Sequence, residues 1–339
     1  MITQEYSHFT DTVHRYAHKK RIPLSVLFEL TYRCNFRCTH CYLSHLRRAK
    51  RPLPELSTQE VYKVLTKLKR MGTLYVGFTG GEIFCRTDVF DILWKAKRLG
   101  FQIIILTNGS LIDHNVAREL KKLSPNKIDI SVYAMSQEFF EKFTGSTAPY
   151  KSVLDAVRML QEEKLPVSLK SCVLEENKNE IIKISNFAHT HNISFSIEED
   201  ISKCLDGSGG PLRHRIPPDQ SFTIRKKCFP LLFTPKDLKG RTRSLTKNRR
   251  ILWDNLFPCG VGRSSLVINP EGKLRMCTQI NYPLDDVVHG SLEEGWQRIK
   301  EYVDALKPPL DWECPQCDLL HFCRWCPGVS YLEDGTFFS

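Results

Sequence analysis

Between residues 24 and 197, short apolar segments alternate with longer segments of helical periodicity. The apolar segments hold five to seven residues and are rich in Ile, Leu, Val and Phe, as buried strands are. In the segments between them, apolar residues recur every three or four positions, as on one face of an α-helix. The predicted strands are 24–30, 74–78, 102–106, 127–132, 167–173 and 193–197, and the predicted helices begin at Ser57 and cover 88–99, 114–123, 153–163 and 179–191.

This alternation predicts an α/β fold in which helices cover the outer face of a parallel sheet. Six strand–helix units are too few for a complete eight-fold barrel, so we expect a partial (β/α)6 TIM-like barrel. Glycine- and proline-rich turns replace the pattern after residue 197. We divide the chain into an N-terminal extension (1–23), the partial barrel (24–203), a basic bridge (204–254) and a small cysteine-rich domain (255–339).

Cysteine is abundant, with 13 among 339 residues. No apolar run approaches the ~20 residues of a membrane-spanning helix, and the first twenty residues lack the apolar core of a secretory signal. We therefore expect a cytoplasmic protein with no membrane partner, whose clustered cysteines bind metal rather than form disulfides. The isolated Cys85, Cys172 and Cys204 are interpreted as small buried hydrophobic residues.

The net charge of +11 is unevenly distributed. Residues 204–258 hold twelve Lys or Arg and four Asp or Glu, a net charge of +8. Such a segment either attracts an acidic partner or is a solvated connector.

Three cysteines follow the first predicted strand with the spacing C-x3-C-x2-C, at Cys34, Cys38 and Cys41. A four-iron cluster normally takes four thiolates, so three leave one iron with an open coordination position. The loop follows the carboxyl end of a strand, where the active sites of parallel barrels gather. The alternative is a zinc knuckle with His40 or His45 as the fourth ligand.

The motif of Cys34, Cys38 and Cys41 resembles the signature of the radical SAM (S-adenosylmethionine) superfamily. The resemblance implies that these cysteines are catalytic and hold a 4Fe–4S cluster, which binds SAM through its open iron. It also implies that His40, which precedes the last cysteine, packs near the adenine.

The sequence Gly80-Gly81-Glu82 after the second predicted strand is similar to the GGE motif of that family. Two glycines let the backbone approach a ligand closely, and Glu82 offers a charge to a cation. The resemblance implies binding of the methionyl amino group by backbone carbonyls and the carboxylate. We expect Glu82 to lie outside the core.

Polar residues also end the third and fourth predicted strands, at Asn108 and Ser131. The resemblance implies SAM contacts to the ribose or carboxylate, and the alternative is a capped turn at a strand end. Relatives often carry an arginine after the fourth strand. None is present here, which leaves Lys142 or Lys170 as its substitute.

Six further cysteines lie near the C-terminus in an arrangement that contains two C-x2-C pairs, which is typical of metal sites and leaves zinc as an alternative. The layout resembles the SPASM domain of peptide-modifying radical SAM enzymes, which binds auxiliary iron–sulfur clusters. The resemblance implies one ligand set of Cys259, Cys277 and Cys326 and a second of Cys314, Cys317 and Cys323.

This region departs from the SPASM pattern in two ways. Its last spacing is x2 rather than x3, and the chain stops at Ser339 without a final cysteine. The first set would recruit Cys228 or stay open for substrate. The second set would take Asp334 or a solvent molecule as its fourth ligand. Otherwise its cluster is absent, or the chain is truncated before a final cysteine. We therefore expect one or two auxiliary clusters.

The resemblance implies a radical SAM enzyme that reductively cleaves SAM to a 5′-deoxyadenosyl radical and modifies a peptide side chain. One alternative is a maturase of an enzyme's active-site residue, as in sulfatase maturation. Another is a non-enzymatic zinc protein that binds nucleic acid, but segment 213–250 lacks the interleaved aromatic residues of single-strand binding. We expect no nucleic-acid partner.

The expected partners are a peptide or protein substrate, acidic if the bridge attracts it, and a reductant such as flavodoxin or ferredoxin. The N-terminal segment is too short for a winged-helix recognition domain, which leaves the bridge or a separate protein to recognise a leader peptide.

Overall fold

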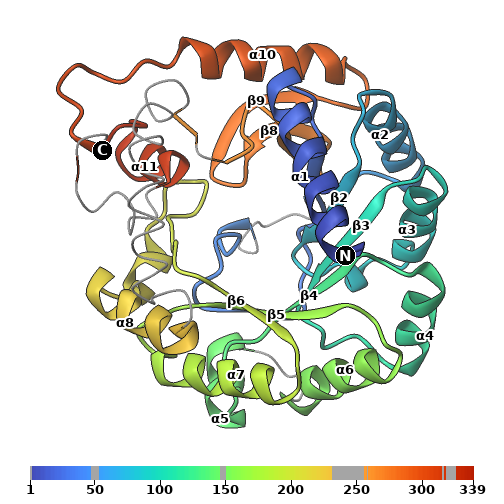
Figure 1. Cartoon of the computed structure of the whole chain (residues 1–339), viewed down its shortest axis with the longest axis vertical. Coiled ribbons are helices and arrows are strands. Elements are labelled where there is room, and N and C mark those ends of the chain that lie inside the picture. The colour runs from blue at the N-terminus through green and yellow to red at the C-terminus, as the bar shows by residue number, and fades with distance from the viewer. Residues whose placement is uncertain are drawn as a thin grey trace.

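The computed structural model describes residues 2–46, 53–145, 150–230, 256–257, 259–314, 317 and 326–339. The strands are β1 (Ser25–Thr31), β2 (Tyr75–Gly80), β3 (Gln102–Thr107), β4 (Lys127–Ser131), β5 (Val167–Cys172), β6 (Ser194–Glu198), β7 (Ser265–Ile268), β8 (Lys273–Cys277) and β9 (Ile280–Asp286). They form one sheet in the order β6-β5-β4-β3-β2-β1-β7-β8-β9. The sheet curves around the centre of the molecule and helices cover its outer side (Figure 1).

Five of the helices follow the strands as predicted. These are α2 (Thr58–Arg70), α3 (Val89–Arg98), α4 (His114–Leu123), α6 (Tyr150–Glu162) and α7 (Lys178–Thr190). The structure adds α1 (Ile2–Lys20), α5 (Gln137–Thr144), α8 (Pro218–Cys228), α10 (Leu292–Ala305), α11 (Pro327–Asp334) and the 3-10 turns η2 (Ile83–Cys85) and η3 (Gly210–His214).

The prediction of an α/β partial barrel is confirmed. Strands β1 to β6 pair in chain order and all pairs are parallel. At the start of α2, Ser57 accepts a hydrogen bond from the Glu60 amide, while the Glu60 carboxylate accepts one from the Ser57 amide. This capping box satisfies backbone donors that the first helical turn leaves unpaired.

The cysteine-rich region extends the barrel's own sheet, which the sequence pattern does not predict. Strand β7 pairs with β1 in parallel, and β8 and β9 continue the sheet as antiparallel strands. Apolar residues on both sides of this junction, such as Val26 and Leu266, belong to one core cluster. The two predicted domains therefore share a core.

A buried ion pair spans the same junction. The Arg275 guanidinium on β8 lies 3.1 Å from the Glu29 carboxylate on β1, and both side chains are at most 1% exposed. The Tyr42 hydroxyl also donates to Glu29, at 3.0 Å. Burial raises the pKa of Glu29, and Arg275 opposes that rise. Strand β8 is thus connected through Glu29 to the segment that follows Cys41.

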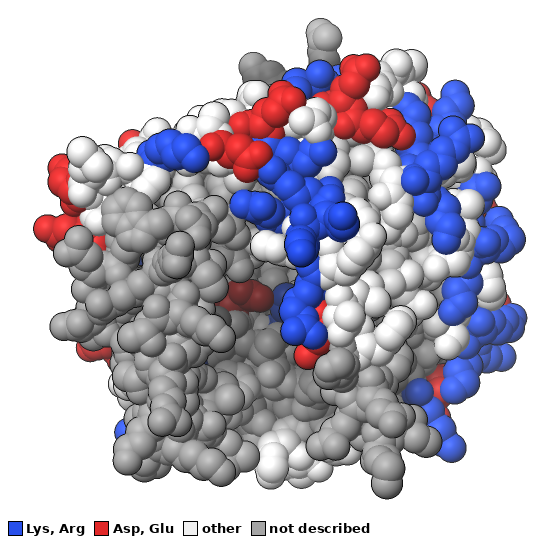
Figure 2. Space-filling view, turned by 45° about the horizontal axis from the view of Figure 1, so that its top comes forward, with Lys and Arg blue, Asp and Glu red and all other residues white. Residues whose placement is uncertain are grey.

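Basic side chains gather over the side of the molecule where α2, α3 and α4 lie (Figure 2). Cations near a helix C-terminus interact favourably with the helix dipole. Part of the positive charge therefore stabilises the C-terminal ends of helices. The last turns of these three helices contain Lys67, Lys69, Arg70, Lys95, Lys97, Arg98, Lys121 and Lys122. Much of the basic bridge, from 231 to 255, lies outside the described residues. Among the described residues, no helix is both long enough and apolar enough to cross a membrane.

Candidate functional site

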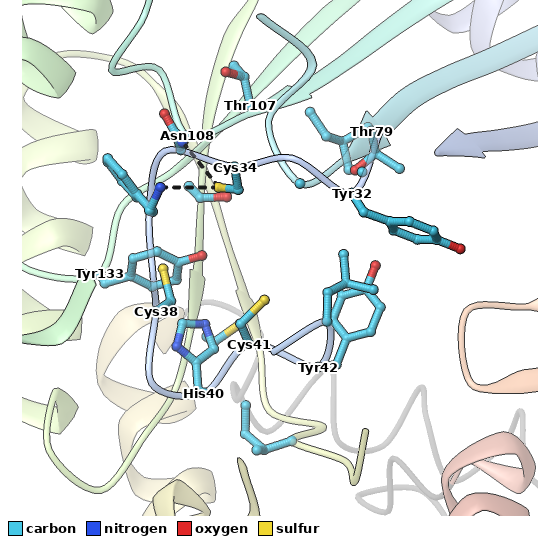
Figure 3. Close-up of a pocket in the computed structure, with 18 of the residues that line it drawn as sticks. Tyr32, Cys34, Cys38, His40, Cys41, Tyr42, Thr79, Thr107, Asn108 and Tyr133 are labelled. Atoms are coloured by element: carbon cyan, nitrogen blue, oxygen red, sulfur yellow. Dashed lines mark hydrogen bonds between the residues drawn. The ribbon is translucent and has the colours of Figure 1, made fainter. Parts of the chain in front are cut away.

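A cavity of about 250 Å³ lies at the carboxyl ends of the barrel strands. The three motif cysteines line this cavity together, and Figure 3 shows their sulfur atoms. The structure thus brings together most of the predicted site. The predicted residues on its wall are Cys34, Cys38, His40, Cys41, Gly80, Gly81, Asn108 and Ser131.

Helix α5 fixes the cysteine loop. The Thr39 amide donates to the carbonyl of Phe143 at 3.2 Å. The His40 ring stacks on Phe143 with centroids 4.9 Å apart and meets the edge of Tyr133 at 4.8 Å. The aromatic packing therefore orients His40 beside the cavity. The sequence analysis did not predict this helix, although its phenylalanines recur at helical spacing.

The two glycines are required by close backbone approach. A Cβ atom on Gly80 would lie 2.2 Å from the Thr31 carbonyl oxygen, and one on Gly81 would lie 2.2 Å from that of Arg33. Gly80 also has a φ angle of +137°, a backbone conformation that residues with a side chain rarely adopt. The Gly81 amide donates to the Thr31 carbonyl at 2.7 Å. The glycines therefore seat the end of β2 against the start of the cysteine loop.

The expectation that Glu82 lies outside the core is wrong, because its side chain is 0% exposed. Its carboxylate accepts hydrogen bonds from the Thr107 hydroxyl at 2.8 Å, the Asn108 amide at 2.6 Å and the Phe84 amide at 3.1 Å. Burial raises its pKa, while these hydrogen bonds lower it. Glu82 therefore holds the end of β3 in place beside the cavity, so its replacement would disturb both the fold and the site.

The side-chain amide of Asn108 points toward the sulfur atom of Cys34. Its Nδ2 lies 3.9 Å from Cys34 Sγ (Figure 3). The same Nδ2 donates to Asn35 Oδ1 at 2.9 Å. The Phe36 amide also donates to Cys34 Sγ, at 3.4 Å. Hydrogen bonds to ligating sulfurs help to set the reduction potential of an iron–sulfur cluster. Sequence reasoning assigned Asn108 to SAM, and the structure adds this contact with the cysteine loop.

We expect Asn108→Ala to lower the reduction potential of the cluster held by this loop, on the order of tens of millivolts. The variant removes one donor to Cys34, and sulfur charge that is less well stabilised disfavours the reduced cluster. A redox titration followed by electron paramagnetic resonance measures the shift. Ser131→Ala, which removes a hydroxyl from the same cavity, is the control, and both variants are titrated without SAM. Equal potentials in the two variants would contradict the assignment.

The cavity is also lined by residues that were not predicted from the sequence as site residues. Cys172 lines it from the end of β5, so its interpretation as only a core residue is wrong. Burial raises the pKa of Cys172 to about 12, which keeps its thiol protonated at neutral pH. Ser202 donates to Gln279 Oε1 at 2.8 Å, and both line the cavity. Gln279 follows β8, so the cysteine-rich region supplies part of the wall. The position of Cys172 at the end of a predicted strand is the feature of the sequence that could have identified it as a residue of the site.

Three distant cysteines also come together. Burial, together with smaller contributions from the nearby Cys326 and Cys259 sulfurs, raises the pKa of Cys277 to about 12. A thiol whose pKa is raised in this way ionises readily only beside positive charge, which a metal cluster supplies. The trio therefore fits the expected donor set for an auxiliary cluster.

The second predicted set is only partly within the described residues. The Cys317 amide donates to the Cys314 carbonyl at 3.2 Å, in one turn, and Cys323 lies outside the described residues. Cys228 ends α8 and is placed against α7, where Ser185 donates to its carbonyl at 3.4 Å. In the described part of the chain, no contact joins Cys228 to the first set.

Neither proposed substitute for the family's arginine lines the cavity. Lys142 is exposed on α5, and Lys170 pairs with Glu198 at 3.1 Å. Among the described residues on the cavity wall there is no Lys or Arg.

Residues 28–188 match the family model of the Radical SAM superfamily. This part of the chain is a radical SAM domain, and a cysteine-rich region follows it. One structural neighbour, Streptococcus suis SuiB, has been solved with bound S-adenosylmethionine.

Two curated proteins and one solved structure are similar over most of the chain. The subtilosin biosynthesis protein AlbA of Bacillus subtilis is 26% identical, over 92% of this chain and 68% of AlbA. The AdoMet-dependent heme synthase of Methanosarcina barkeri is 25% identical, over 93% of this chain and 94% of that protein. Streptococcus suis SuiB, solved with its precursor peptide SuiA, has the same fold, with a TM-score of 0.71, 16% identity, and coverage of 98% of this chain and 79% of SuiB.

Proposed function

We propose that this enzyme modifies a side chain of a peptide, with Cys34, Cys38 and Cys41 holding the catalytic cluster. The observation that carries this proposal is that the cysteine loop lines a cavity to which Gln279 of the cysteine-rich region also contributes. The bound cluster and SAM supply one-electron chemistry that activates an unreactive C–H bond. The similarity to AlbA, a bacteriocin biosynthesis protein, supports a peptide substrate.

The residues of this chain divide the remaining work. Gly80 and Gly81 let the backbone come close to SAM, and His40 and Ser131 contact it. Gln279 and Cys172 face the substrate. We assign one auxiliary cluster to the first SPASM set and a second to Cys314, Cys317 and Cys323. The limits 24–203, 204–254 and 255–339 remain our division of the chain.

We further propose a cytoplasmic enzyme that receives electrons from a flavodoxin or ferredoxin and is assisted by a separate peptide-recognition protein. A low-potential donor is needed because SAM cleavage is reductive.

Anaerobically purified protein is expected to be brown and to hold more than four irons per chain, since a 4Fe–4S cluster at the first motif accounts for about four. Iron and zinc are measured by plasma mass spectrometry. A count near four would mean that the auxiliary sites carry no cluster. Stoichiometric zinc with negligible iron would contradict the whole assignment.

The substrate is tested by co-expression with short reading frames encoded beside this gene. Mass spectrometry of the recovered peptide is expected to show a change that depends on the enzyme, such as the loss of two hydrogens in a cross-link. Oxidation of a Cys or Ser in a protein substrate would instead support the maturase alternative.

A second candidate is tetrapyrrole chemistry. The alignment with the heme synthase covers nearly the whole of both chains, 93% and 94%. The same reduced enzyme is therefore offered an iron porphyrin with carboxylate side chains. SAM-dependent conversion of the porphyrin, with no change in any peptide, would favour this candidate.

We also propose that the substrate or its leader is acidic. Neutralising Arg241, Arg243, Arg249 and Arg250 is expected to raise the apparent KM several-fold at low salt and to leave uncoupled SAM cleavage intact. Long-range attraction acts mainly on encounter and is screened over ~8 Å at physiological ionic strength. Assays at low and high salt measure the effect. A KM that changes neither with the charge of the bridge nor with the salt concentration would show that the bridge is a solvated connector.

A further inference from the structure

Three metal-ligating side chains of different type converge beside the cavity. His45, Cys204 and Asp206 each place a ligand atom within 4.8 Å of the other two. His45 lies four residues after Cys41, whereas the other two follow β6. Sequence reasoning interpreted Cys204 as a buried hydrophobic residue and considered His45 only for a zinc knuckle with the motif cysteines.

Each side chain is oriented by neighbouring groups. His45 Nδ1 lies 3.1 Å from the Tyr42 carbonyl oxygen. A carbonyl can only accept, so Nδ1 carries the proton and Nε2 keeps its lone pair for a metal. Metal-ligating histidines commonly donate their other ring N–H to a carbonyl in this way.

The turn after β6 positions the other two ligands. The Cys204 amide donates to the Ser208 carbonyl at 3.0 Å, and the Gly207 amide donates to the Cys204 carbonyl at 2.9 Å. The Asp206 Oδ1 atom accepts from the Ser208 amide at 2.9 Å and from its hydroxyl at 2.6 Å, which leaves Oδ2 for a metal. Cys204 is 0% exposed and Asp206 is exposed, so the group spans from the interior to the surface.

We propose that His45, Cys204 and Asp206 bind Zn²⁺. One imidazole, one thiolate and one carboxylate suit zinc, whereas Mg²⁺ and Ca²⁺ prefer oxygen ligands alone. The two negative ligands balance the charge of the ion. Three protein ligands leave a fourth tetrahedral position for water. The ion bridges the segment after Cys41 to the turn after β6.

This bridge would act on the wall of the cavity. Tyr42 and Leu43, just before His45, line the cavity, as do Ile201 and Ser202, just before Cys204. Zinc at this position joins the two wall segments, and the site does not depend on the identity of the substrate.

The test uses holoenzyme with its iron–sulfur clusters assembled, given one equivalent of Zn²⁺ under anaerobic conditions. The Zn K-edge X-ray absorption spectrum is expected to show one sulfur at about 2.3 Å and nitrogen or oxygen ligands at about 2.0–2.2 Å. Competition with a chromogenic chelator measures affinity, which His45→Ala and Asp206→Asn should each weaken by ~10-fold or more.

The matched controls are His189→Ala and Asp219→Asn, which change exposed residues of the same types elsewhere. Asp206 is exposed, so Asp206→Asn is expected to fold, and its iron content and circular dichroism check this. Zinc surrounded only by sulfur would indicate occupation of the cluster cysteines and overturn the proposal. Equal affinity in the wild type and both site variants, or no retained zinc, would also overturn it.

Discussion

Simultaneous replacement of Cys34, Cys38 and Cys41 by alanine is expected to abolish reductive cleavage of SAM. These thiols are the cysteine side chains of the loop that lines the cavity, and without thiolates the loop cannot hold iron. The activity should fall below detection, and the iron content should fall by about four per chain. Chromatographic measurement of 5′-deoxyadenosine after reduction with dithionite follows the activity.

Cys85→Ala is the control for this loss. Cys85 follows Gly80-Gly81-Glu82 closely in the chain but is not among the described residues that line the cavity. The control should keep both iron and activity. Formation of 5′-deoxyadenosine at the wild-type rate by the triple variant would show that the catalytic cluster is held elsewhere.

Arg275→Ala is expected to destabilise the protein by about 3–5 kcal/mol, because it leaves the Glu29 carboxylate buried without its partner. The midpoint of urea unfolding, followed by circular dichroism, should fall accordingly. The double variant Glu29→Gln with Arg275→Met removes both charges and should recover much of the loss, because no buried charge is then left without a partner.

An exposed ion pair provides the comparison. Arg298 pairs with Asp285, and its side chain is 44% exposed. Arg298→Ala should leave the unfolding midpoint almost unchanged, because solvent screens such a pair. A loss for Arg275→Ala no larger than that for Arg298→Ala would mean that the buried pair does not stabilise the junction of β1 and β8.

The barrel and the cysteine loop could be predicted because their signals are local. Strands buried on both faces give continuous apolar runs, and the cysteine spacing marks one loop. The contacts of Glu82 and Cys172 could not be predicted in the same way. Each depends on which strand ends meet. The sequence pattern of a strand end is the same whether the side chain faces a cavity, as Cys172 does, or a neighbouring loop, as Glu82 does.

The extension of the sheet is a second case. The pairing of β7 with β1 joins segments about 240 positions apart, Ser25 with Ser265, and nothing in the periodicity of either strand specifies the other. The grouping of Cys259, Cys277 and Cys326 was predicted only through resemblance to the SPASM pattern, since spacing alone also allowed zinc.

The same pairing has a consequence for synthesis of the chain. Strand β1 leads directly into the cysteine loop, yet one of its two neighbours is β7, which the ribosome delivers only after the whole barrel has been made. Until then, the β1 edge presents unpaired backbone groups, which is the feature that invites misassociation between nascent chains. The strand that leads into the cysteine loop therefore gains its second neighbour only after translation has passed Ile268.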